Sequence, residues 1–448
     1  MLTQRFIMTE KTPPKAGRRW LKMAGMTTSI AARYAGHQMK KPFLDEQERL
    51  AAEKKLNARN GEKIAETLGE LKGAVMKMGQ LASQVADLLP EELANNLKVL
   101  QREAPPMPYS VIAAQIEAEL GQLPEQVFAR FDVKPFAAAS IGQVHRACLS
   151  DGSEVIVKVQ YPGVAESVQA DMRQLKRAMR MARIVKVSKK TLDALFLEIQ
   201  ARIVEELDYE REARMIGRFS EFLADMPKLV LPEVKPEFST ARILTLSYEA
   251  GDHIDEVSDK YPQTVIDEIG ETLFRCFFRQ LFELGSIHAD PHAGNFAFRP
   301  DGTIVLYDFG CVKEVKPESV SCYGRLVQAA LNENYDEVEA GLLELGARVP
   351  GSDRPSNEFY AGWRAILLKP FLGDQPFNFA ESNMHKRVAA RTSEVLKLGE
   401  QLQPPVETTF VDRMVAGHYW TMVNLGVNVA FGPLLRSMLE DHFAAASA

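Results

Sequence analysis

The stretch GSIHADPHAGNFAFRPDGTIVLYDFG, residues 285–310, decides how the rest of the chain is interpreted. It contains the pattern His288-x-Asp290-x-x-x-x-Asn295, and thirteen residues after Asn295 comes Asp308-Phe309-Gly310. Two carboxylates and an amide are hard-oxygen ligands of the kind that Mg²⁺ prefers, and Mg²⁺ in turn bridges phosphate oxygens. The stretch therefore predicts chemistry on a phosphorylated ligand.

Kinases carry both motifs. Their H-R-D-x-x-x-x-N loop supplies an aspartate that accepts the proton of the acceptor hydroxyl and an asparagine that holds one metal ion, while the D-F-G aspartate holds another. A lone His-x-Asp more often forms a turn. The two motifs in this order, with a strand-like apolar run at 304–307 before the second, predict a phosphoryl-transfer fold. Asp290 is then the candidate catalytic residue, and Asn295 and Asp308 are the candidate metal ligands.

Composition limits the class of protein that this chain can be. The chain has 448 residues, 46% of them hydrophobic and 25% charged, which is ordinary for a globular protein with room for two or three domains. Its net charge of −6 argues against nucleic-acid binding. The four cysteines form no C-x-x-C pair, which favours a reduced intracellular protein. We find neither a signal peptide nor an uncharged apolar run long enough to span a membrane.

The N-terminal segment, residues 1–43, has its own charge pattern. Nine lysines and arginines lie between Met1 and Lys41, against the single acid Glu10, and apolar residues are interspersed among them. This pattern fits a basic amphipathic segment on an anionic membrane surface. A flexible, solvated tail is the equal alternative.

Residues 44–127 are expected to form a helical extension. Apolar residues recur every three or four positions from Leu68 to Leu89, which is typical of one helix face. Lys77-Met78-Gly79-Gln80 lies inside this pattern, and a glycine in a helix interior costs about 1 kcal/mol relative to alanine. From the sequence alone, Lys77 is more simply a solvent-facing residue. A further helix is expected at 109–119.

Residues 128–250 are expected to form a small lobe. The stretch from Phe136 to Ala147 predicts strand, tight loop and strand, and Asp151-Gly152 predicts a hairpin turn before a strand at 154–160. In kinases the first loop covers the phosphates, and a lysine on the later strand pairs with them. Lys158 fits that lysine. The candidate phosphate loop is alanine-rich instead of glycine-rich, namely Ala137, Ala138, Ala139 and Ser140.

Residues 166–219 predict two long helices, the second of which contains the acidic stretch 205–213. One carboxylate of that stretch is the natural ion-pair partner of Lys158. Two more strands are expected at 228–236 and 241–248. They are followed by a hinge whose backbone, at Glu249 and Gly251, would hydrogen-bond adenine.

Residues 251–448 are expected to form a helical large lobe, entered through an apolar helix at 264–284. Protein kinases place a long activation segment and an A-P-E motif after D-F-G to dock a peptide. Here the segment after Gly310 is short, helix resumes by about Val320, and no A-P-E context follows. A peptide-docking platform is therefore not evident.

With these pieces placed, the chain resembles the UbiB/AarF-type atypical kinase-like family, which is associated with ubiquinone biosynthesis. The resemblance runs from about residue 44 to about residue 345. The family's K-x-G-Q helix matches Lys77-Met78-Gly79-Gln80, its alanine-rich loop matches residues 137–140, and its E-x-D motif matches Glu206-Leu207-Asp208.

The resemblance implies an α+β, two-lobed protein-kinase-like fold with the N-terminal helical extension packed over the nucleotide site. It pairs Lys77 with Glu206 and leaves Glu212 for Lys158. It also implies ATP and Mg²⁺ as cofactors, and ATPase activity that supports lipid or quinone metabolism instead of protein phosphorylation.

Two alternatives stay open: a phosphotransferase for a soluble small molecule, as in aminoglycoside or choline kinases, and a non-catalytic nucleotide-binding scaffold. The expected partners are ATP and an unidentified lipid or quinone-pathway molecule, with no nucleic acid. The expected location is cytoplasmic. Peripheral contact with the inner face of the membrane and a dimeric state are further options that the sequence leaves open.

Overall fold

The computed structural model describes residues 16–40, 45–71, 106–138, 141–181, 189–402 and 408–447. These residues divide into two compact units. The first contains the described residues up to Ala213 together with Glu233–Tyr248, and the second contains Arg214–Pro232 and the described residues from Glu249 onward.

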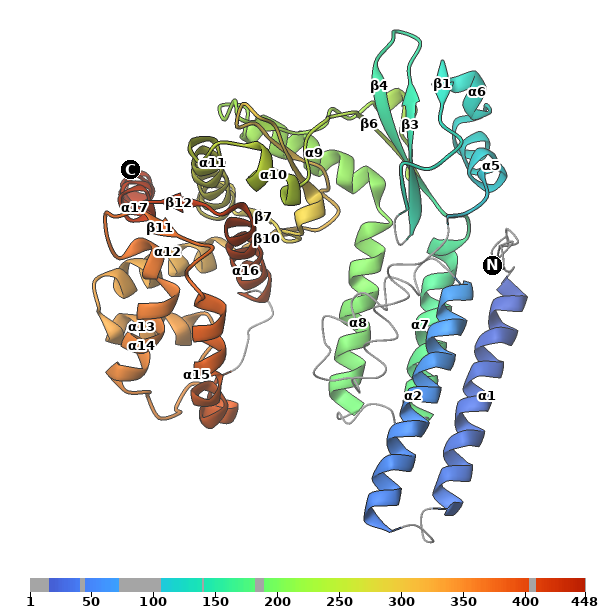
Figure 1. Ribbon diagram of the computed structural model, residues 1–448, viewed down its shortest axis with the longest axis horizontal. Helices are drawn as coiled ribbons and strands as arrows, with labels where there is room; N and C mark the ends of the chain where they lie inside the picture. The colour runs from blue at the N-terminus through green and yellow to red at the C-terminus, as the bar shows by residue number, and fades with distance from the viewer. Residues whose placement is uncertain are drawn as a thin grey trace, which may run out of the picture. The chain divides into compact units, whose positions relative to one another are not determined.

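The first unit is built on a five-stranded antiparallel sheet (Figure 1). The strand order is β1-β3-β4-β6, and β2 also pairs with β3. The bounds are β1 Arg130–Phe131, β2 Ala137–Ala138, β3 Gly142–Cys148, β4 Glu154–Gln160 and β6 Ile243–Ser247. The expected hairpin is confirmed, with Gly152 at φ +86° in its turn, a conformation that glycine adopts without strain.

Helices make up the rest of the first unit. They are α1 Ala16–Lys40, α2 Glu46–Leu71, α5 Tyr109–Leu120, α6 Pro124–Val127, α7 Val164–Met181 and α8 Lys189–Glu206, with the short 3₁₀ turn η3 at Pro236–Phe238. Helix α1 lies against α2 and α7 (Figure 1). Its Met26 and Ile30 are fully buried in the core of the unit, so this face of the basic N-terminal segment packs against protein.

The expectation of two helices between residues 166 and 219 was wrong, because the described residues there form three. Helix α9, Tyr209–Phe222, begins separately from α8. The break occurs at Asp208, whose Oδ1 accepts a hydrogen bond from the backbone N–H of Arg211 at 2.8 Å. An aspartate in this position caps a new helix, because it satisfies an N–H group that has no partner in the first turn.

The strand expected at 228–236 also differs. Only β5, Leu229–Val230, forms there, and it pairs in parallel with β9, Ile304–Leu306, within the second unit. Val234 makes an isolated bridge to Leu246 in the first unit. The chain thus leaves one sheet and contributes to another within a few residues, which the alternation of apolar side chains does not reveal.

The second unit is mainly helical, with small sheets that carry the motif residues. Its strands besides β5 and β9 are β7 Ser286–His288, β8 Phe296–Phe298, β10 Val312–Glu314, β11 Phe377–Asn378 and β12 Asn428–Val429. Its helices are α10 Ile254–Lys260, α11 Gln263–Phe282, α12 Pro317–Leu331, α13 Tyr335–Glu344, α14 Asn357–Leu367, α15 Met384–Leu398, α16 Thr408–Leu425 and α17 Phe431–Ser447. Short 3₁₀ turns are η4 Ala293–Asn295, η5 Lys369–Phe371 and η6 Gly399–Gln401.

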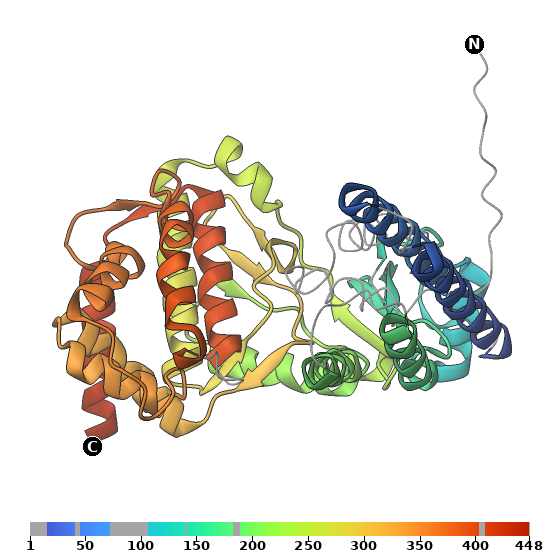
Figure 2. The same ribbon diagram turned by 90° about the horizontal axis from the view of Figure 1, so that it is seen from below.

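Helix α11 is the centre of the second unit. Figure 2 shows it in yellow, and both α16 and α17 contact it. Its buried Leu281 packs against α16 and β7, and its buried Phe278 packs against α17. The apolar helix expected at 264–284 is confirmed, and it delivers the chain directly to the strand that carries His288.

Candidate functional site

Strand pairing brings the two central motifs together in the second unit. Strand β7 pairs antiparallel with β10, so that His288 lies opposite Val312. The backbone N–H of Ala289 then donates to the carbonyl of Cys311 at 2.8 Å. Because one motif follows β7 and the other precedes β10, this pairing places the loop of Asp290 beside the Asp308-Phe309-Gly310 turn.

Asn295 is tied to both motifs. Its side-chain Nδ2 donates to the backbone carbonyl of Asp290 at 2.8 Å and to Asp290 Oδ2 at 3.3 Å. Its own carbonyl accepts from the N–H of Tyr307 at 3.0 Å, one residue before Asp308. Because the amide nitrogen faces two acceptors, the amide oxygen is the atom that Asn295 would present to a cation.

His288 and Phe309 anchor the motifs in the core of this unit. The Nε2 of His288 donates to the backbone carbonyl of Asp308, and the ring lies edge-to-face with Phe309 at a centroid distance of 5.3 Å. Phe309 is fully buried and also meets Phe219 of α9 at 5.1 Å. The Oδ1 of Asp308 accepts from the N–H of Gly310 at 2.9 Å, which fixes the carboxylate relative to the turn.

The donor set in this unit fits Mg²⁺. A Mg²⁺ ion that accompanies a nucleotide is usually held by one or two protein oxygens, with phosphates and water completing its six ligands. The carboxylate of Asp308 and the amide oxygen of Asn295 are ligands of that kind. No cluster of three or more histidine, cysteine, aspartate and glutamate side chains suited to a metal occurs among the described residues.

The first unit contains a second group of functional residues, centred on Lys158. Val155, Val157 and Val159 point into the core from β4, so the alternation of the strand places Lys158 on its other face. There Lys158 Nζ forms an ion pair with Glu212 Oε1 of α9 at 2.6 Å. The pair is well shielded, since the Lys158 side chain is 14% exposed and that of Glu212 is 3% exposed.

The cap at Asp208 helps to place Glu212. Helix α9 begins at Tyr209, and the backbone N–H of Glu212 donates to the carbonyl of Asp208 at 3.0 Å. Tyr209 is buried, and its ring centroid lies 5.5 Å from the Lys158 ammonium. The resemblance to the atypical kinase-like family implied this pairing of Lys158 with Glu212.

The alanine-rich loop is described in part. Ala137 and Ala138 form β2, which is exposed and pairs with Val144 and Gln143 of β3, while Ala139 and Ser140 lie outside the described residues. Strand β3 begins at Gly142, where an added Cβ would lie 2.4 Å from the backbone oxygen of Val159. Only glycine fits at this position, because any side chain would press against the backbone of the lysine-bearing strand.

A buried hydrogen-bond relay through Gln143 and His145 of β3 was not predicted. The backbone N–H of Met107 donates to Gln143 Oε1, Gln143 Nε2 donates to His145 Nε2 at 3.2 Å, and His145 Nδ1 donates to the carbonyl of Asp132 at 2.8 Å. Burial lowers the pKa of His145, which favours the neutral ring that this relay requires. The available signal was that Gln143 and His145 share one face of β3 with the apolar Ala147.

The predicted hinge belongs to the second unit. Glu249 Oε2 pairs with Arg299 Nη2 at 2.8 Å, and the Glu249 carbonyl accepts from the hydroxyl of Tyr307 at 2.7 Å. An added Cβ on Gly251 would lie 2.7 Å from that of Ala297, so a glycine is required where the chain passes β8. The hinge backbone is thereby fixed against β8 and against Tyr307, the residue before Asp308.

The predicted contact between Lys77 and Glu206 has only one member among the described residues. Lys77 lies outside the described residues, and so does its predicted pairing with Glu206. Glu206 itself is the last residue of α8 and is partly exposed.

Arg413 is a site residue that the sequence analysis missed. It lies on α16, and its Nη2 contacts Asp290 Oδ1 at 3.3 Å across 123 residues of sequence. No motif or local periodicity marks it, because the contact depends on how α16 packs against the loop of Asp290.

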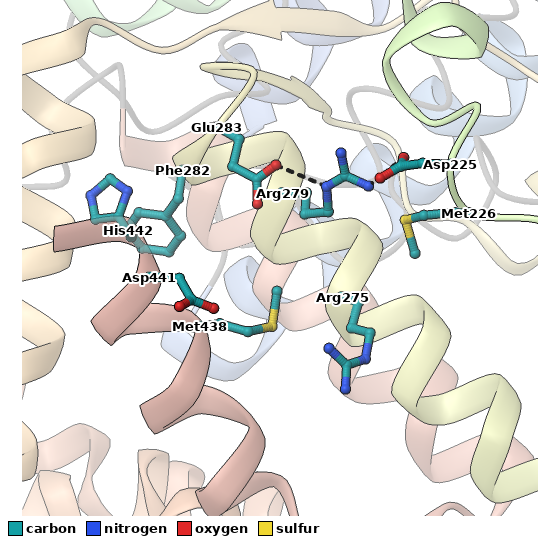
Figure 3. A pocket seen from close by; sticks show the side chains of 9 residues that line it. All are labelled: Asp225, Met226, Arg275, Arg279, Phe282, Glu283, Met438, Asp441 and His442. Atoms are coloured by element: carbon teal, nitrogen blue, oxygen red, sulfur yellow. Dashed lines mark hydrogen bonds and ion pairs between the residues drawn. The ribbon is translucent and has the colours of Figure 1, made fainter. Parts of the chain in front are cut away.

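A surface groove elsewhere in the second unit has a volume of about 810 Å³ (Figure 3). It is lined by residues of α11, of α17 and of the turn after α9, and it includes none of the motif residues. Its Arg279 is already paired with Asp225 at 2.7 Å and with Glu283 at 2.8 Å. The charges of the groove therefore largely cancel, and they favour no particular ligand.

A strand lysine paired with a helix glutamate, together with the two adjoining motifs of the second unit, defines a protein-kinase-like protein. The sequence matches the family of the ABC1 atypical kinase-like domain over residues 99–341. The chain belongs to this family.

The relatives agree with that assignment. The chain is 31% identical over 449 residues to the mitochondrial atypical kinase COQ8 of Schizosaccharomyces pombe, covering 98% of this chain and 72% of that protein. It is 30% identical over 416 residues to the mitochondrial atypical kinase COQ8B of Rattus norvegicus, covering 91% and 75% respectively. Among solved structures it is similar to Rv3197 of Mycobacterium tuberculosis, determined in complex with erythromycin, with a TM-score of 0.59 and 26% identity over 88% of this chain and 98% of that one.

These similarities confirm the kinase-like α+β fold and the family expected from the sequence. Within the described ranges, none of the helices combines the length and the apolar character needed to cross a bilayer.

Proposed function

We propose that the protein is a Mg²⁺-dependent ATPase of the atypical kinase type, which transfers the γ-phosphoryl group of ATP to water or to a small hydroxyl acceptor. The observation that carries this proposal is the β7–β10 pairing, which gathers Asp290, Asn295 and Asp308 in one unit. These three residue types at these positions serve no evident purpose in a scaffold that only binds nucleotide.

Each motif residue receives a role in this proposal. Asp290 accepts a hydrogen bond from the attacking water or hydroxyl and orients it, and Asn295 and Asp308 hold Mg²⁺. When bound, Mg²⁺ would neutralise charge on the β- and γ-phosphates. Lys158 contacts phosphate oxygens, and Glu212 holds the lysine in place.

The remaining predicted residues would complete the nucleotide site. Residues 137–140 would cover the phosphates, and the backbone at Glu249 and Gly251 would hydrogen-bond adenine. We extend the proposal to Lys77, with Glu206 as its partner, and to residues 44–127 as an extension that belongs to the nucleotide site.

The acceptor is proposed to be water or a small molecule of lipid or quinone metabolism, and not a protein. After Gly310 the chain enters β10 and then α12 at Pro317, which leaves little sequence for a peptide-docking segment. The similar M. tuberculosis protein was solved with erythromycin, a bulky and largely apolar small molecule. The names of the COQ8 relatives support the link to quinone metabolism.

The test is phosphate release from Mg-ATP by the purified chain, with and without anionic liposomes. Asp308→Asn removes the proposed metal ligand, and Asp301→Asn is a matched control, since Asp301 is an exposed turn residue whose Oδ1 accepts from the N–H of Thr303. Release that is abolished by Asp308→Asn and retained by Asp301→Asn supports the ATPase. Stimulation by liposomes would direct the search to lipid substrates.

Two other outcomes favour the alternatives. Phosphate on a soluble acceptor, with little release to water, would favour the small-molecule phosphotransferase. Tight Mg-ATP binding without turnover under any of these conditions would favour the scaffold and refute the proposal.

A further inference from the structure

The carboxylate of Asp290 is held by two donors from distant parts of the second unit. Its Oδ2 accepts from Asn295 Nδ2 at 3.3 Å, and its Oδ1 accepts from Arg413 Nη2, also at 3.3 Å. Each oxygen thus has a nitrogen donor, one from the catalytic loop and the other from α16. The orientation of the carboxylate depends on both.

The catalytic loop has no cation of its own. Residues 289–295 contain neither lysine nor arginine, and Ala289 stands where the H-R-D motif of kinases has arginine. Arg413 therefore supplies the positive charge next to Asp290. It does so from beyond the matched kinase-like domain, which ends at residue 341.

Helix α16 packs closely against the loop, and this packing fixes the backbone position from which the Arg413 side chain extends. Met414, fully buried, shares a core cluster with Ile287 and Ala289 on either side of His288. An added Cβ on Gly417 would lie 2.0 Å from Cγ of Pro291, the residue after Asp290. One turn of α16 is therefore in direct contact with the loop, and only a glycine permits that approach.

Arg413 is held in place by its surroundings. Its side chain is 28% exposed, and its Nη1 is buried without a hydrogen-bond partner among the described residues. A buried guanidinium N–H without an acceptor costs free energy, so another interaction of the same side chain must offset that cost. The contact with Asp290 is the interaction that offsets it.

We propose that Arg413 is a positioning residue of the active site. It holds the Asp290 carboxylate in the orientation that the attacking water or hydroxyl requires, and α16 is accordingly part of the catalytic unit. This inference rests on the proposed role of Asp290 in phosphoryl transfer. Arg413 acts through Asp290, and the nucleotide is bound by other residues.

The first test is steady-state turnover of the full chain and its variants. Arg413→Gln should lower kcat by ~10- to 100-fold, because misplacing a catalytic group by about 1 Å has an effect of that size. The KM for Mg-ATP should change little. Arg413→Lys should recover part of the loss, because lysine keeps the positive charge but lacks the planar guanidinium group. Arg436→Gln on α17 is the matched control, as Arg436 pairs with Asp374 on the surface.

The decisive comparison is a double-mutant cycle with Asp290→Asn. Residues that act through one another are non-additive, so Arg413→Gln should cause no further loss of kcat once Asp290 is replaced. A merely structural arginine would lower activity equally in both backgrounds, and that result would overturn the inference. A rise in KM with unchanged kcat would also overturn it.

A second readout separates this inference from the proposed function. If the native chain binds Mg-ATP but shows no turnover, the ATPase proposal fails, and the same cycle is then measured on the midpoint of urea unfolding. Non-additive changes of the midpoint would support the coupling between Arg413 and Asp290. Additive midpoints would reject it.

Discussion

Lys158 and Glu212 form a 2.6 Å ion pair although 54 residues separate them in the chain. The strand places the ammonium away from the core, and a separately capped helix brings the carboxylate to it. Because Glu212 is almost fully buried, the pair has a low effective dielectric around it, and the loss of either member leaves the other with an uncompensated charge.

Glu212→Gln should therefore destabilise the protein by roughly 1–3 kcal/mol and weaken Mg-ATP binding, since a charge loses its partner. The double substitution Lys158→Met with Glu212→Leu should recover most of the unfolding free energy, because apolar residues of similar volume can replace a buried ion pair. It should not recover nucleotide binding. Urea unfolding and titration calorimetry measure the two effects, and restored binding in the double variant would contradict the role of Lys158.

Asp208 is expected to act as a helix cap within the Glu206-Leu207-Asp208 motif. Asp208→Ala should cost about 1 kcal/mol of stability, whereas Asp208→Asn should cost much less, because asparagine caps about as well as aspartate. Nucleotide affinity should follow the same order, since α9 carries Glu212. Equal losses in the two variants would indicate that the charge of Asp208 matters more than its cap.

Gly417→Ala should lower both stability and turnover. The added methyl has no room beside Pro291, and overpacking of this kind typically costs about 1–3 kcal/mol. Gly217 in α9 is a matched control, because an added Cβ there meets nothing within 4 Å among the described residues. Gly217→Ala should stabilise the protein by about 0.4–1 kcal/mol through reduced entropy of the unfolded chain. Thermal unfolding and phosphate release would show whether the two glycines differ as expected.

His418 makes the stability of the protein depend on pH. Burial, with a smaller contribution from nearby His288, lowers the pKa of His418 to about 4. The folded state therefore binds fewer protons than the unfolded state between about pH 6.5 and pH 4, so stability should fall as the pH is lowered through that window, by up to about 3 kcal/mol in total.

The ring of His418 lies between Phe277 and Phe296, and its Nδ1 is buried without a partner among the described residues. His418→Phe is thus a suitable substitution. It should flatten the dependence of the urea midpoint on pH between 6.5 and 4 relative to the native chain. An unchanged slope would mean that His418 takes up its proton without unfolding.

Several parts of the fold could be predicted from short stretches of sequence. The strand at 154–160, the hairpin at Asp151-Gly152 and the helix that begins at Tyr109 follow from alternation, turn residues and helical periodicity. Each of these signals is complete within a few neighbouring residues. The prediction of two helices over 166–219 failed because Asp208 was interpreted as part of an acidic cluster, although its short side chain also caps α9.

The candidate site was predictable where a motif marks it and not elsewhere. Asp290, Asn295 and Asp308 stand out by their fixed spacing. Arg413 and the Met107–Gln143–His145 relay could not be found in that way, because their partners are distant in sequence and any of several arginines or glutamines would have looked equally suitable.

The sequence by itself determined the family, the kinase-like α+β fold and the residue types of the two motifs, because these depend on local patterns and on the chemistry of individual side chains. Only the tertiary structure decided that β5 joins β9, that a helix break at Asp208 precedes α9, and that Arg413 contacts Asp290. Such pairings are set by how helices and strands pack as whole surfaces. A close approach such as that of Gly417 to Pro291 cannot be inferred from the order of residues along the chain.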